Sequence, residues 1–285
     1  MSGSLLEGRV IAITGGGRGV GRAHALACAR EGAAGILVND LGCDLSGQGS
    51  DPSVADAVAE AIRVEHGVAA EADHHDVGEA GASVRIVEHA LDRFGRLDAL
   101  IGCAGVSADQ TVMKLGDELL DRMIDVHVRG SFGLVRAAGR AMIDRGEGGA
   151  ILLHTAPAAF FGAMRQSALA ATTGAVVGLV RSAAVELRKH RIRINALAPT
   201  ARTRATEELP LFKGIGPGSM GPEFVGPVGA FLVSELAADV SGEVIGAAGT
   251  RVYALHGRET PGWFGDAEPP RAAEVASAWP EITRA

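Results

Sequence analysis

Residues 10–21 read V-I-A-I-T-G-G-G-R-G-V-G, and this stretch decides the fold. Its apolar start predicts a buried strand, five glycines follow between Thr14 and Gly21, and residues 23–30 have a helical pattern. Glycines at such a turn let the backbone approach a pyrophosphate, and the N–H groups of the helix N-terminus point at its charge. The order of strand, glycine turn and helix predicts a dinucleotide-binding cradle, with an ordinary turn as the alternative.

The composition argues against several classes of protein. With 285 residues, of which 47% are hydrophobic and 21% charged, the chain is expected to form one globular domain with a tail. The net charge of −7 argues against a nucleic-acid partner, because phosphate binding needs clustered Lys and Arg. No apolar run approaches the ~18 residues that cross a bilayer, and residues 1–8 lack a secretion signal. We therefore expect no membrane partner.

The three cysteines indicate a reducing compartment. Cys28, Cys43 and Cys103 lack the spacing of metal ligands, and their number is odd. Free thiols in a reducing environment explain this pattern best. The sequence predicts a cytoplasmic protein without a metal site.

Apolar runs and helical patterns alternate along the chain. Strands are expected at residues 35–39, 68–72, 97–101, 150–155, 192–198 and 243–247, and helices at residues 84–94, 117–143 and 168–189. A further helix is expected to begin at Ser53, with Asp56 as a possible capping partner, after a Gly-, Ser- and Asp-rich loop at residues 41–52. This alternation predicts an α/β protein whose parallel sheet is covered on both faces, with the ligand at the carboxyl ends of the strands.

Two acidic residues stand where a dinucleotide would need them. Asp40 ends the second apolar run, about twenty positions after the glycines. A carboxylate there accepts hydrogen bonds from the adenosine ribose and repels a 2′-phosphate, so it favours NAD over NADP. Asp76, which precedes Val77, follows the third strand and is expected to meet the adenine amino group. The alternatives are a turn aspartate and an exposed loop acid.

Three motifs in order resemble the short-chain dehydrogenase/reductase family, over about residues 6–249. They are T-G-G-G-R-G-V-G at 14–21, A-G at 104–105 and R-I-N-A-L-A-P at 193–199. V-N-D-L-G at 38–42, D-V-H-V-R-G-S-F at 125–132 and A-R-T-R-A-T-E-E-L at 201–209 are similar to the branch of bacterial 3-hydroxyacyl-CoA dehydrogenases, peroxisomal multifunctional β-oxidation enzymes and hydroxysteroid dehydrogenases. The resemblance implies a Rossmann-type, doubly wound sheet of seven parallel strands in a three-layer αβα fold, NAD binding and usually a homotetramer.

The catalytic residues that the resemblance implies are missing. In the family a Tyr exchanges a proton with the substrate oxygen, a Lys four residues later lowers its pKa, and a Ser thirteen residues earlier binds that oxygen. The register set by Gly162 and the V-V-G-L at 176–179 puts Leu169, Thr173 and Ala156 at these positions. Loss of acid–base help alone removes about 10²–10⁴ in rate.

A few polar residues remain nearby as substitutes. They are Thr155, Ser167, Thr172, Thr173, His127 and His154. His154 lies two residues before Ala156 on one strand, so both side chains share a face and His154 is a candidate proton donor. A histidine packed against the sheet is the alternative. His127 falls at the position of the family's water-ordering Asn, and we expect a structural or water-ordering role for it.

The cofactor contacts implied by the resemblance are better preserved. Thr203, four residues after Pro199, matches the nicotinamide amide contact. The Lys that holds the nicotinamide ribose is absent, so we expect the nicotinamide to be poorly placed, whereas the contacts to the adenosine half of NAD are expected to be intact. The predicted cofactor residues are Gly15, Gly17, Arg18, Gly19, Val20, Gly21, Asp40, Asp76, Val77, Ala104, Gly105, Pro199 and Thr203.

Two further segments carry expectations. Residues 207–223 are rich in glycine and proline and suit either a mobile flap over the cleft or a plain surface loop. Residues 250–285 are expected to form a tail that packs, through Trp263 and Trp279, on the body or on a neighbouring subunit. Within it, residues 271–278 have a helical pattern.

Three functions are compatible with this sequence. The first is a degenerate NAD(H)-binding relative that binds a hydrophobic, acyl-CoA-like or steroid ligand and acts as a partner subunit, in a homotetramer or with an intact relative. The second is an atypical oxidoreductase that uses His127, His154 or Thr155. The third is a non-redox enzyme such as a cyclase, dehydratase or isomerase.

Overall fold

The computed structural model describes residues 4–216, 218–265 and 269–284. In this part of the chain eight strands form one sheet in the order β3-β2-β1-β4-β5-β6-β7-β8. Their bounds are β1 Val10–Thr14, β2 Gly35–Asn39, β3 Ala69–Asp73, β4 Ala99–Gly102, β5 Gly149–His154, β6 Ile192–Thr200, β7 Val244–Ala248 and β8 Arg251–Ala254. The first seven strands are parallel, which confirms the predicted doubly wound α/β sheet.

The eighth strand is an addition to the expected fold. β8 runs antiparallel to β7 and pairs with it from Ile245 to Ala248. The chain divides into two compact units, Met1–Ala254 and Leu255–Ala285, so the stretch at the start of the expected tail belongs to the sheet. The second unit contains helix α9 (Ala272–Ile282), close to the predicted helical pattern. Whether it packs on a neighbouring subunit stays a prediction.

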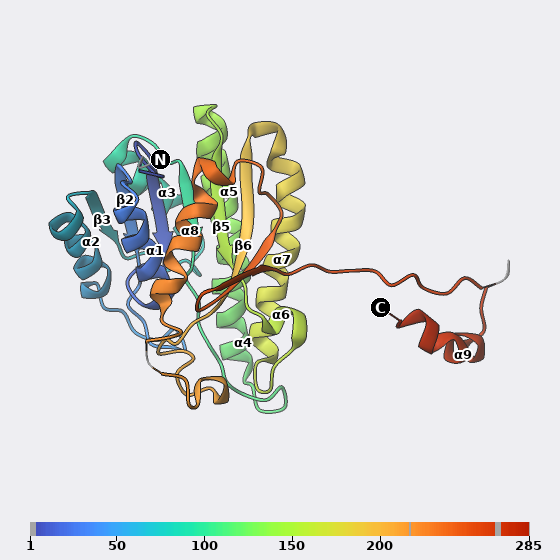
Figure 1. Cartoon of the computed structure of the whole chain (residues 1–285). Helices are drawn as coiled ribbons and strands as arrows, with labels where there is room; N and C mark the ends of the chain where they lie inside the picture. The colour runs from blue at the N-terminus through green and yellow to red at the C-terminus, as the bar shows by residue number, and fades with distance from the viewer. Residues whose placement is uncertain (1–3, 217, 266–268, 285) are drawn as a thin grey trace. The chain divides into compact units, whose positions relative to one another are not determined.

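Helices cover both faces of the sheet (Figure 1). One layer contains α1 (Gly19–Arg30), α2 (Ser53–His66) and α8 (Gly226–Val233), and the other contains α3 (Ala82–Phe94), α5 (Ser131–Arg145) and α7 (Ser167–Leu187). Short helices α4 (Asp117–Met123) and α6 (Ala158–Phe161) lead into α5 and α7. All five residues of β1 and of β2 are buried, as a parallel sheet covered on both sides requires. The three-layer αβα architecture is confirmed.

Local details differ from the expectations at two helices. The helix predicted at residues 117–143 is interrupted between α4 and α5 by a π-helical turn, Ile124–Gly130, which carries His127. Such turns inside helices often accompany functional sites. At the start of α2 the capping expectation was wrong: Ser53 donates through its N–H and its hydroxyl to Asp51, whereas Asp56 pairs with His74.

One helix is apolar enough to resemble a membrane span, which the sequence analysis did not anticipate. The helical stretch Ser167–His190 has a mean hydropathy of 1.5, and 50% of its apolar window is buried inside the fold. It contains α7, which packs on β6. A core helix of an αβα layer has the same length and composition, so this helix is weak evidence for a membrane.

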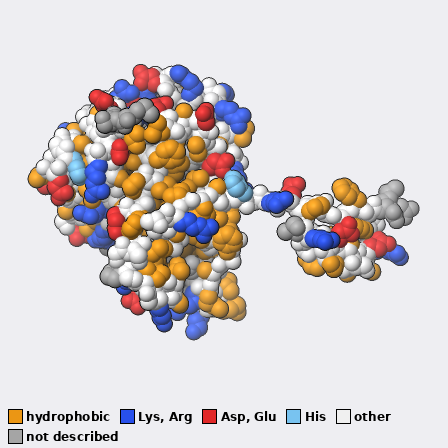
Figure 2. All heavy atoms as spheres, in the orientation of Figure 1, with side chains coloured by type: hydrophobic (Ala, Val, Ile, Leu, Met, Phe, Trp, Pro, Cys, Tyr) orange, Lys and Arg blue, Asp and Glu red, His pale blue; other side chains and the backbone are white. Residues whose placement is uncertain are grey.

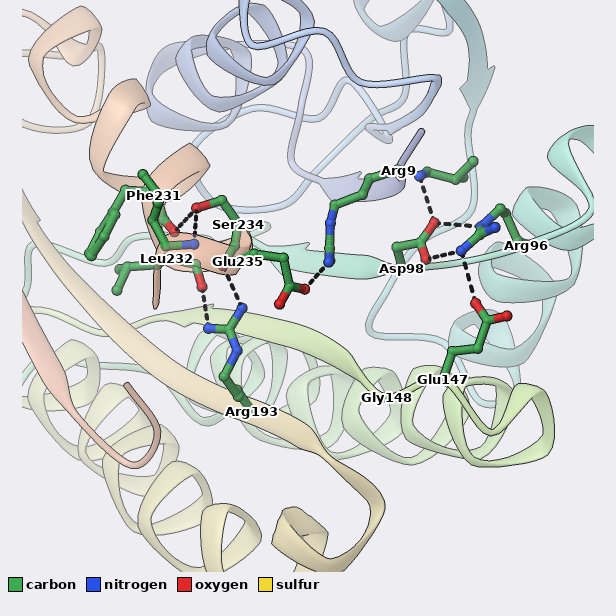
Figure 3. Close-up of polar contacts among 12 residues, drawn as sticks. Arg9, Arg96, Asp98, Glu147, Gly148, Arg193, Phe231, Leu232, Ser234 and Glu235 are labelled. Atoms are coloured by element: carbon green, nitrogen blue, oxygen red, sulfur yellow. Dashed lines mark hydrogen bonds and ion pairs between the residues drawn. The ribbon is translucent and has the colours of Figure 1, made fainter. Parts of the chain in front are cut away.

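At the amino-terminal ends of the strands, an ion-pair network surrounds the buried carboxylate of Asp98 (Figure 3). The Asp98 carboxylate accepts hydrogen bonds from the N–H of Val10 (2.9 Å) and from Nε of Arg96 (2.9 Å), and it pairs with Arg145 (2.7 Å). Burial alone would raise the pKa of Asp98, but these hydrogen bonds outweigh it and hold the pKa below its ordinary value. The network ties β1, β4 and the end of α5 together at the edge opposite the carboxyl ends of the strands.

Charged side chains do not gather into one basic surface on the visible face of the body. Lys and Arg side chains are scattered there among acidic and apolar ones (Figure 2).

Candidate functional site

A cavity of about 620 Å³ opens at the carboxyl ends of β1, β4, β5 and β6. It is the place where doubly wound folds bind ligands. With the exception of Gly17, the structure brings all the predicted cofactor residues to its wall, together with His127, His154, Thr155, Ala156, Leu169 and Thr173. Ser167 and Thr172 are not among the lining residues of the described chain.

The glycine turn makes the floor of this cavity. Gly15 has a φ of +65°, and a Cβ atom there would lie 2.7 Å from the backbone of Ala104 after β4. A Cβ atom on Gly21 would lie 2.0 Å from the carbonyl oxygen of Gly15. Only glycine permits both approaches, so the turn brings the first residues of α1 against the ends of β1 and β4.

Asp40 is fixed by the same turn. One carboxylate oxygen accepts a hydrogen bond from the N–H of Gly17 (2.9 Å), and the other accepts one from the N–H of Gly42 (2.8 Å). Each oxygen retains a second lone pair. Asp40 therefore stands rigidly at the cavity wall with acceptor capacity for a pair of hydroxyl groups.

Asp76 lines the end of the cavity where the adenosine is expected, and its carboxylate is already paired. Its carboxylate lies 2.8 Å from Nη1 of Arg122 on α4 and accepts a hydrogen bond from the N–H of Gly78 (2.8 Å). Val77 beside it is buried and lines the same wall. The pairing with Arg122 was not evident from the sequence, since the two residues lie far apart in the chain.

His127 has both ring nitrogens engaged. Nε2 accepts a hydrogen bond from the N–H of Val106 (3.1 Å), and Nδ1 lies 2.8 Å from the hydroxyl of Thr172. Because Nε2 is an acceptor, the proton of a neutral ring is on Nδ1, and the Thr172 hydroxyl in turn donates to the Ala168 carbonyl (2.8 Å). Burial lowers the pKa of His127 to about 4. The ring connects the π-helical turn to β4 and α7.

His154 is engaged in the same way, by a partner that the sequence analysis missed. Its Nδ1 lies 3.0 Å from the Gly102 carbonyl oxygen, and its Nε2 lies 3.0 Å from Nε2 of His24 on α1. Nδ1 of His24 faces the Gly226 carbonyl oxygen at 3.3 Å. Burial lowers the pKa of His154 to about 4, and burial followed by the neighbouring ring lowers that of His24 to about 3.

The three positions at which the family resemblance implies Ser, Tyr and Lys, namely Ala156, Leu169 and Thr173, all line this cavity. Ala156 and Leu169 are half-buried and present apolar side chains. The hydroxyl of Thr173 donates back to the Leu169 carbonyl within α7, and the hydroxyl of Thr155 donates to the Thr173 carbonyl (2.9 Å). Burial raises the pKa of the nearby Cys103 thiol to about 12, so it stays protonated at neutral pH.

The segment after β6 closes the cavity from the other side. Thr203 lies over the glycine turn, with its Cγ2 atom 3.3 Å from the position of a Cβ on Gly19. The N–H of Thr203 donates to the Thr206 hydroxyl (2.9 Å). Further along, Phe212 is buried, and Pro217 of the expected flap lies outside the described residues. The mobility of this flap stays a prediction.

Comparisons with known proteins agree with this geometry. The family model for short chain dehydrogenases matches residues 9–210. The chain belongs to the short-chain dehydrogenase/reductase family. A short-chain type dehydrogenase/reductase of Mycobacterium tuberculosis is 35% identical over 279 residues, with 98% of this chain and 95% of that protein covered.

Two other members of the family bear on function. The peroxisomal multifunctional enzyme type 2 of Mus musculus is 38% identical over 229 residues, which are 80% of this chain but only 30% of that enzyme. Carveol dehydrogenase from Mycobacterium avium, solved in complex with NAD, has a TM-score of 0.76 and 26% identity, with 85% of this chain and 97% of that chain covered. The resemblance to the β-oxidation branch is confirmed.

Proposed function

We propose that this member of the family binds NAD(H) and acts as a binding or regulatory subunit without the family's dehydrogenase mechanism. Its ligand is a hydrophobic or acyl-CoA-like hydroxyl or keto compound. In this proposal the protein descends from oxidoreductases, lacks their proton-transfer residues and acts as a partner subunit.

One observation carries the proposal: proton-transfer groups at the catalytic end are absent or already engaged. Ala156 and Leu169 have no exchangeable proton, and the hydroxyls of Thr155 and Thr173 donate to helix carbonyls. His127 and His154, described above, use both ring nitrogens within the fold. A general acid needs a free proton and a pKa near the working pH.

The adenosine end supports the binding half of the proposal. Asp40 keeps free lone pairs for ribose hydroxyls, and the close contact of Gly21 with Gly15 aims the start of α1 into the cavity. The NAD complex of the related carveol dehydrogenase agrees with this cofactor. The Lys that grips the nicotinamide ribose in the family is replaced by Thr173, so we infer that the nicotinamide is held less firmly than the adenosine.

The test is a pair of measurements on the purified full chain. NADH titration followed by fluorescence should give a micromolar dissociation constant, and Gly21→Ala, whose Cβ would meet the Gly15 carbonyl and distort the glycine turn, should abolish that binding. With saturating NAD, 3-hydroxyacyl-CoA thioesters and steroid alcohols should give no turnover above a blank. Robust NAD-linked turnover by this protein alone would contradict the proposal, as would the absence of NADH binding.

The contact between His24 and His154 favours one alternative, an atypical oxidoreductase. Nδ1 of each ring faces a carbonyl oxygen and carries the proton of the neutral ring, so the two Nε2 atoms, 3.0 Å apart, can share one additional proton between them. That alternative predicts turnover that His154→Phe removes while NADH binding persists. Turnover that survives His154→Phe together with His127→Phe would exclude it.

The assembly is a further part of the proposal. The family resemblance supports a homotetramer, and the loss of the usual catalytic residues favours a mixed oligomer with an intact relative; the free cysteines support a cytoplasmic location. The mass of the purified protein, alone and after co-expression with such a relative, separates the two cases.

A further inference from the structure

The loop after β2 extends across the cavity. Residues 41–48, called the strap below, leave β2 beside Asp40, and three of them line the cavity: Leu41, Cys43 and Leu45. The Leu45 carbonyl accepts a hydrogen bond from the N–H of Ser107 (2.8 Å), in the segment after β4. In the sheet, β1 lies between β2 and β4. The strap begins after β2 and therefore reaches past β1 to the cavity wall formed by the segment after β4.

The tip of the strap rests on the adenosine end. Gly47 packs so closely on Arg122 that a Cβ atom there would lie 2.6 Å from Nε of that arginine. Arg122 is the residue whose guanidinium pairs with Asp76. The tip therefore covers the ion pair at the place where the adenine is expected.

A third attachment joins the strap to the remaining walls. The Cys43 carbonyl accepts hydrogen bonds from Nη1 of Arg18 in the glycine turn (2.9 Å) and from Nη2 of Arg204 after β6 (3.1 Å). Arg204 lies on the segment whose Thr203 covers Gly19. One carbonyl oxygen of the strap is thus held from both sides of the cradle.

The strap also has a fixed internal turn. The Asp44 carboxylate accepts hydrogen bonds from the N–H of Ser46 (2.8 Å), the hydroxyl of Ser46 (2.8 Å) and the N–H of Gln48 (2.9 Å). These bonds lower the pKa of Asp44 below its ordinary value, so the carboxylate stays charged near neutral pH. Asp44 itself is not among the cavity-lining residues of the described chain.

We propose that the strap is the outer wall of the adenosine site and that an adenine dinucleotide leaves only when the strap opens. This inference rests on the proposed NAD(H) binding. The side chain of Leu45, which lines the cavity and is 39% exposed, offers an apolar surface to a flat base. The strap is closed by hydrogen bonds within the protein, so the same opening must admit the dinucleotide, and weakening the closed strap accelerates release and association together while the dissociation constant changes little. The device suits a subunit that retains its cofactor without turning it over.

The test is the rate of NADH release, measured by stopped-flow fluorescence with excess NAD as the competitor. Asp44→Ala unties the internal turn without touching the cavity, and Arg204→Gln removes the bond to Cys43. Arg204→Gln removes one hydrogen bond of the closed strap and Asp44→Ala removes three, so release should be at least about fivefold faster in each variant. Association should accelerate by a similar factor, and the dissociation constant should stay within about threefold of wild type. Asp144→Ala, which removes an exposed acid paired with Arg140 on α5, is the matched control and should release NADH at the wild-type rate.

The outcomes separate this inference from the proposed function. NADH binding with wild-type release rates in both Asp44→Ala and Arg204→Gln overturns the strap and leaves the proposed function standing. Faster release in Arg204→Gln alone shows direct contact of Arg204 with the cofactor and also overturns it. A wild-type protein that does not bind NADH removes both proposals. As a second readout, the amides of Ser46 and Ser107 should exchange hydrogen more slowly when NADH is bound.

Discussion

Acidification should destabilise this protein, and the buried His127 should carry a measurable part of the loss. Its pKa in the folded chain is lowered by burial to about 4, below the ordinary value of 6.5 that applies in the unfolded chain. Between these values the unfolded state binds more protons than the folded state. The contribution of His127 to stability is therefore complete above about pH 6.5 and is lost as the pH falls towards 4.

The size of the effect follows from the shift. One pKa unit corresponds to about 1.4 kcal/mol, so the whole shift is worth about 3 kcal/mol, of which about 2 kcal/mol is lost by pH 5. His154 and His24, whose pKa values burial lowers to about 4 and about 3, act in the same direction. His127→Gln removes one titrating ring and should reduce the slope of unfolding free energy between pH 5 and 6 by about 1.2 kcal/mol per pH unit.

Urea unfolding of the full chain at pH 5, 5.5, 6 and 8 measures this slope. The slope is informative even if His127→Gln lowers stability at pH 8, because only the titrating group changes the pH dependence. His74→Gln is the control, since the side chain of His74 is 40% exposed and lies outside the buried set. An unchanged slope in His127→Gln, or an NMR titration of the His127 ring with a midpoint above pH 6, would refute the reasoning and strengthen the case for histidine catalysis.

Three further changes test the site and the scaffold. Asp40→Ala removes the ribose acceptor and the anchor of the Gly17 N–H, so NADH affinity in a fluorescence titration should fall at least about tenfold; unchanged affinity would mark Asp40 as a turn residue. Gly21→Ala should leave no measurable NADH binding while the circular dichroism spectrum stays folded, and retained binding would show that the cradle is not the cofactor site. Asp98→Asn leaves Arg145 without its buried partner and should lower the urea-derived unfolding free energy by about 3 kcal/mol. The control Asp144→Ala, which removes an exposed ion pair, should lower it by less than about 0.5 kcal/mol. Equal losses in the two variants would count against the network.

The sequence was sufficient for the parts of the site that depend on chain order. A glycine turn between β1 and α1 has one place in a doubly wound fold, and the acid that ends β2 must then stand beside it. The Gly17–Asp40 hydrogen bond is the direct consequence of that order. The assignment of Ala156, Leu169 and Thr173 to the family's catalytic positions depends on the family resemblance together with the register of β5 and α7, and it stays a prediction.

Contacts between distant segments could not be predicted in this way. Hydrophobic periodicity places His24 on the buried side of α1 but does not say that β5 presents His154 opposite it. The strap was visible only as a loop rich in Gly, Ser and Asp, and its attachment to Ser107 depends on the spacing of β2 and β4 in the sheet. β8 was missed because a four-residue antiparallel strand after Gly249 carries no periodic signal.

The two ends of the cavity differ in how far their polar groups are satisfied within the fold, as the proposed separation of binding from catalysis requires. At the catalytic end, Thr173 bonds its own helix and Thr155 bonds the Thr173 carbonyl, so the replacements are hydrogen-bonded within the fold and need no ligand. At the adenosine end, Asp40 retains lone pairs, and Gly15 holds a φ of +65° against Ala104. Such a backbone approach is useful where a ligand must come close to the main chain. The adenosine end therefore keeps acceptor capacity at Asp40 that the fold itself does not use, and the proposed dinucleotide binding needs such acceptors.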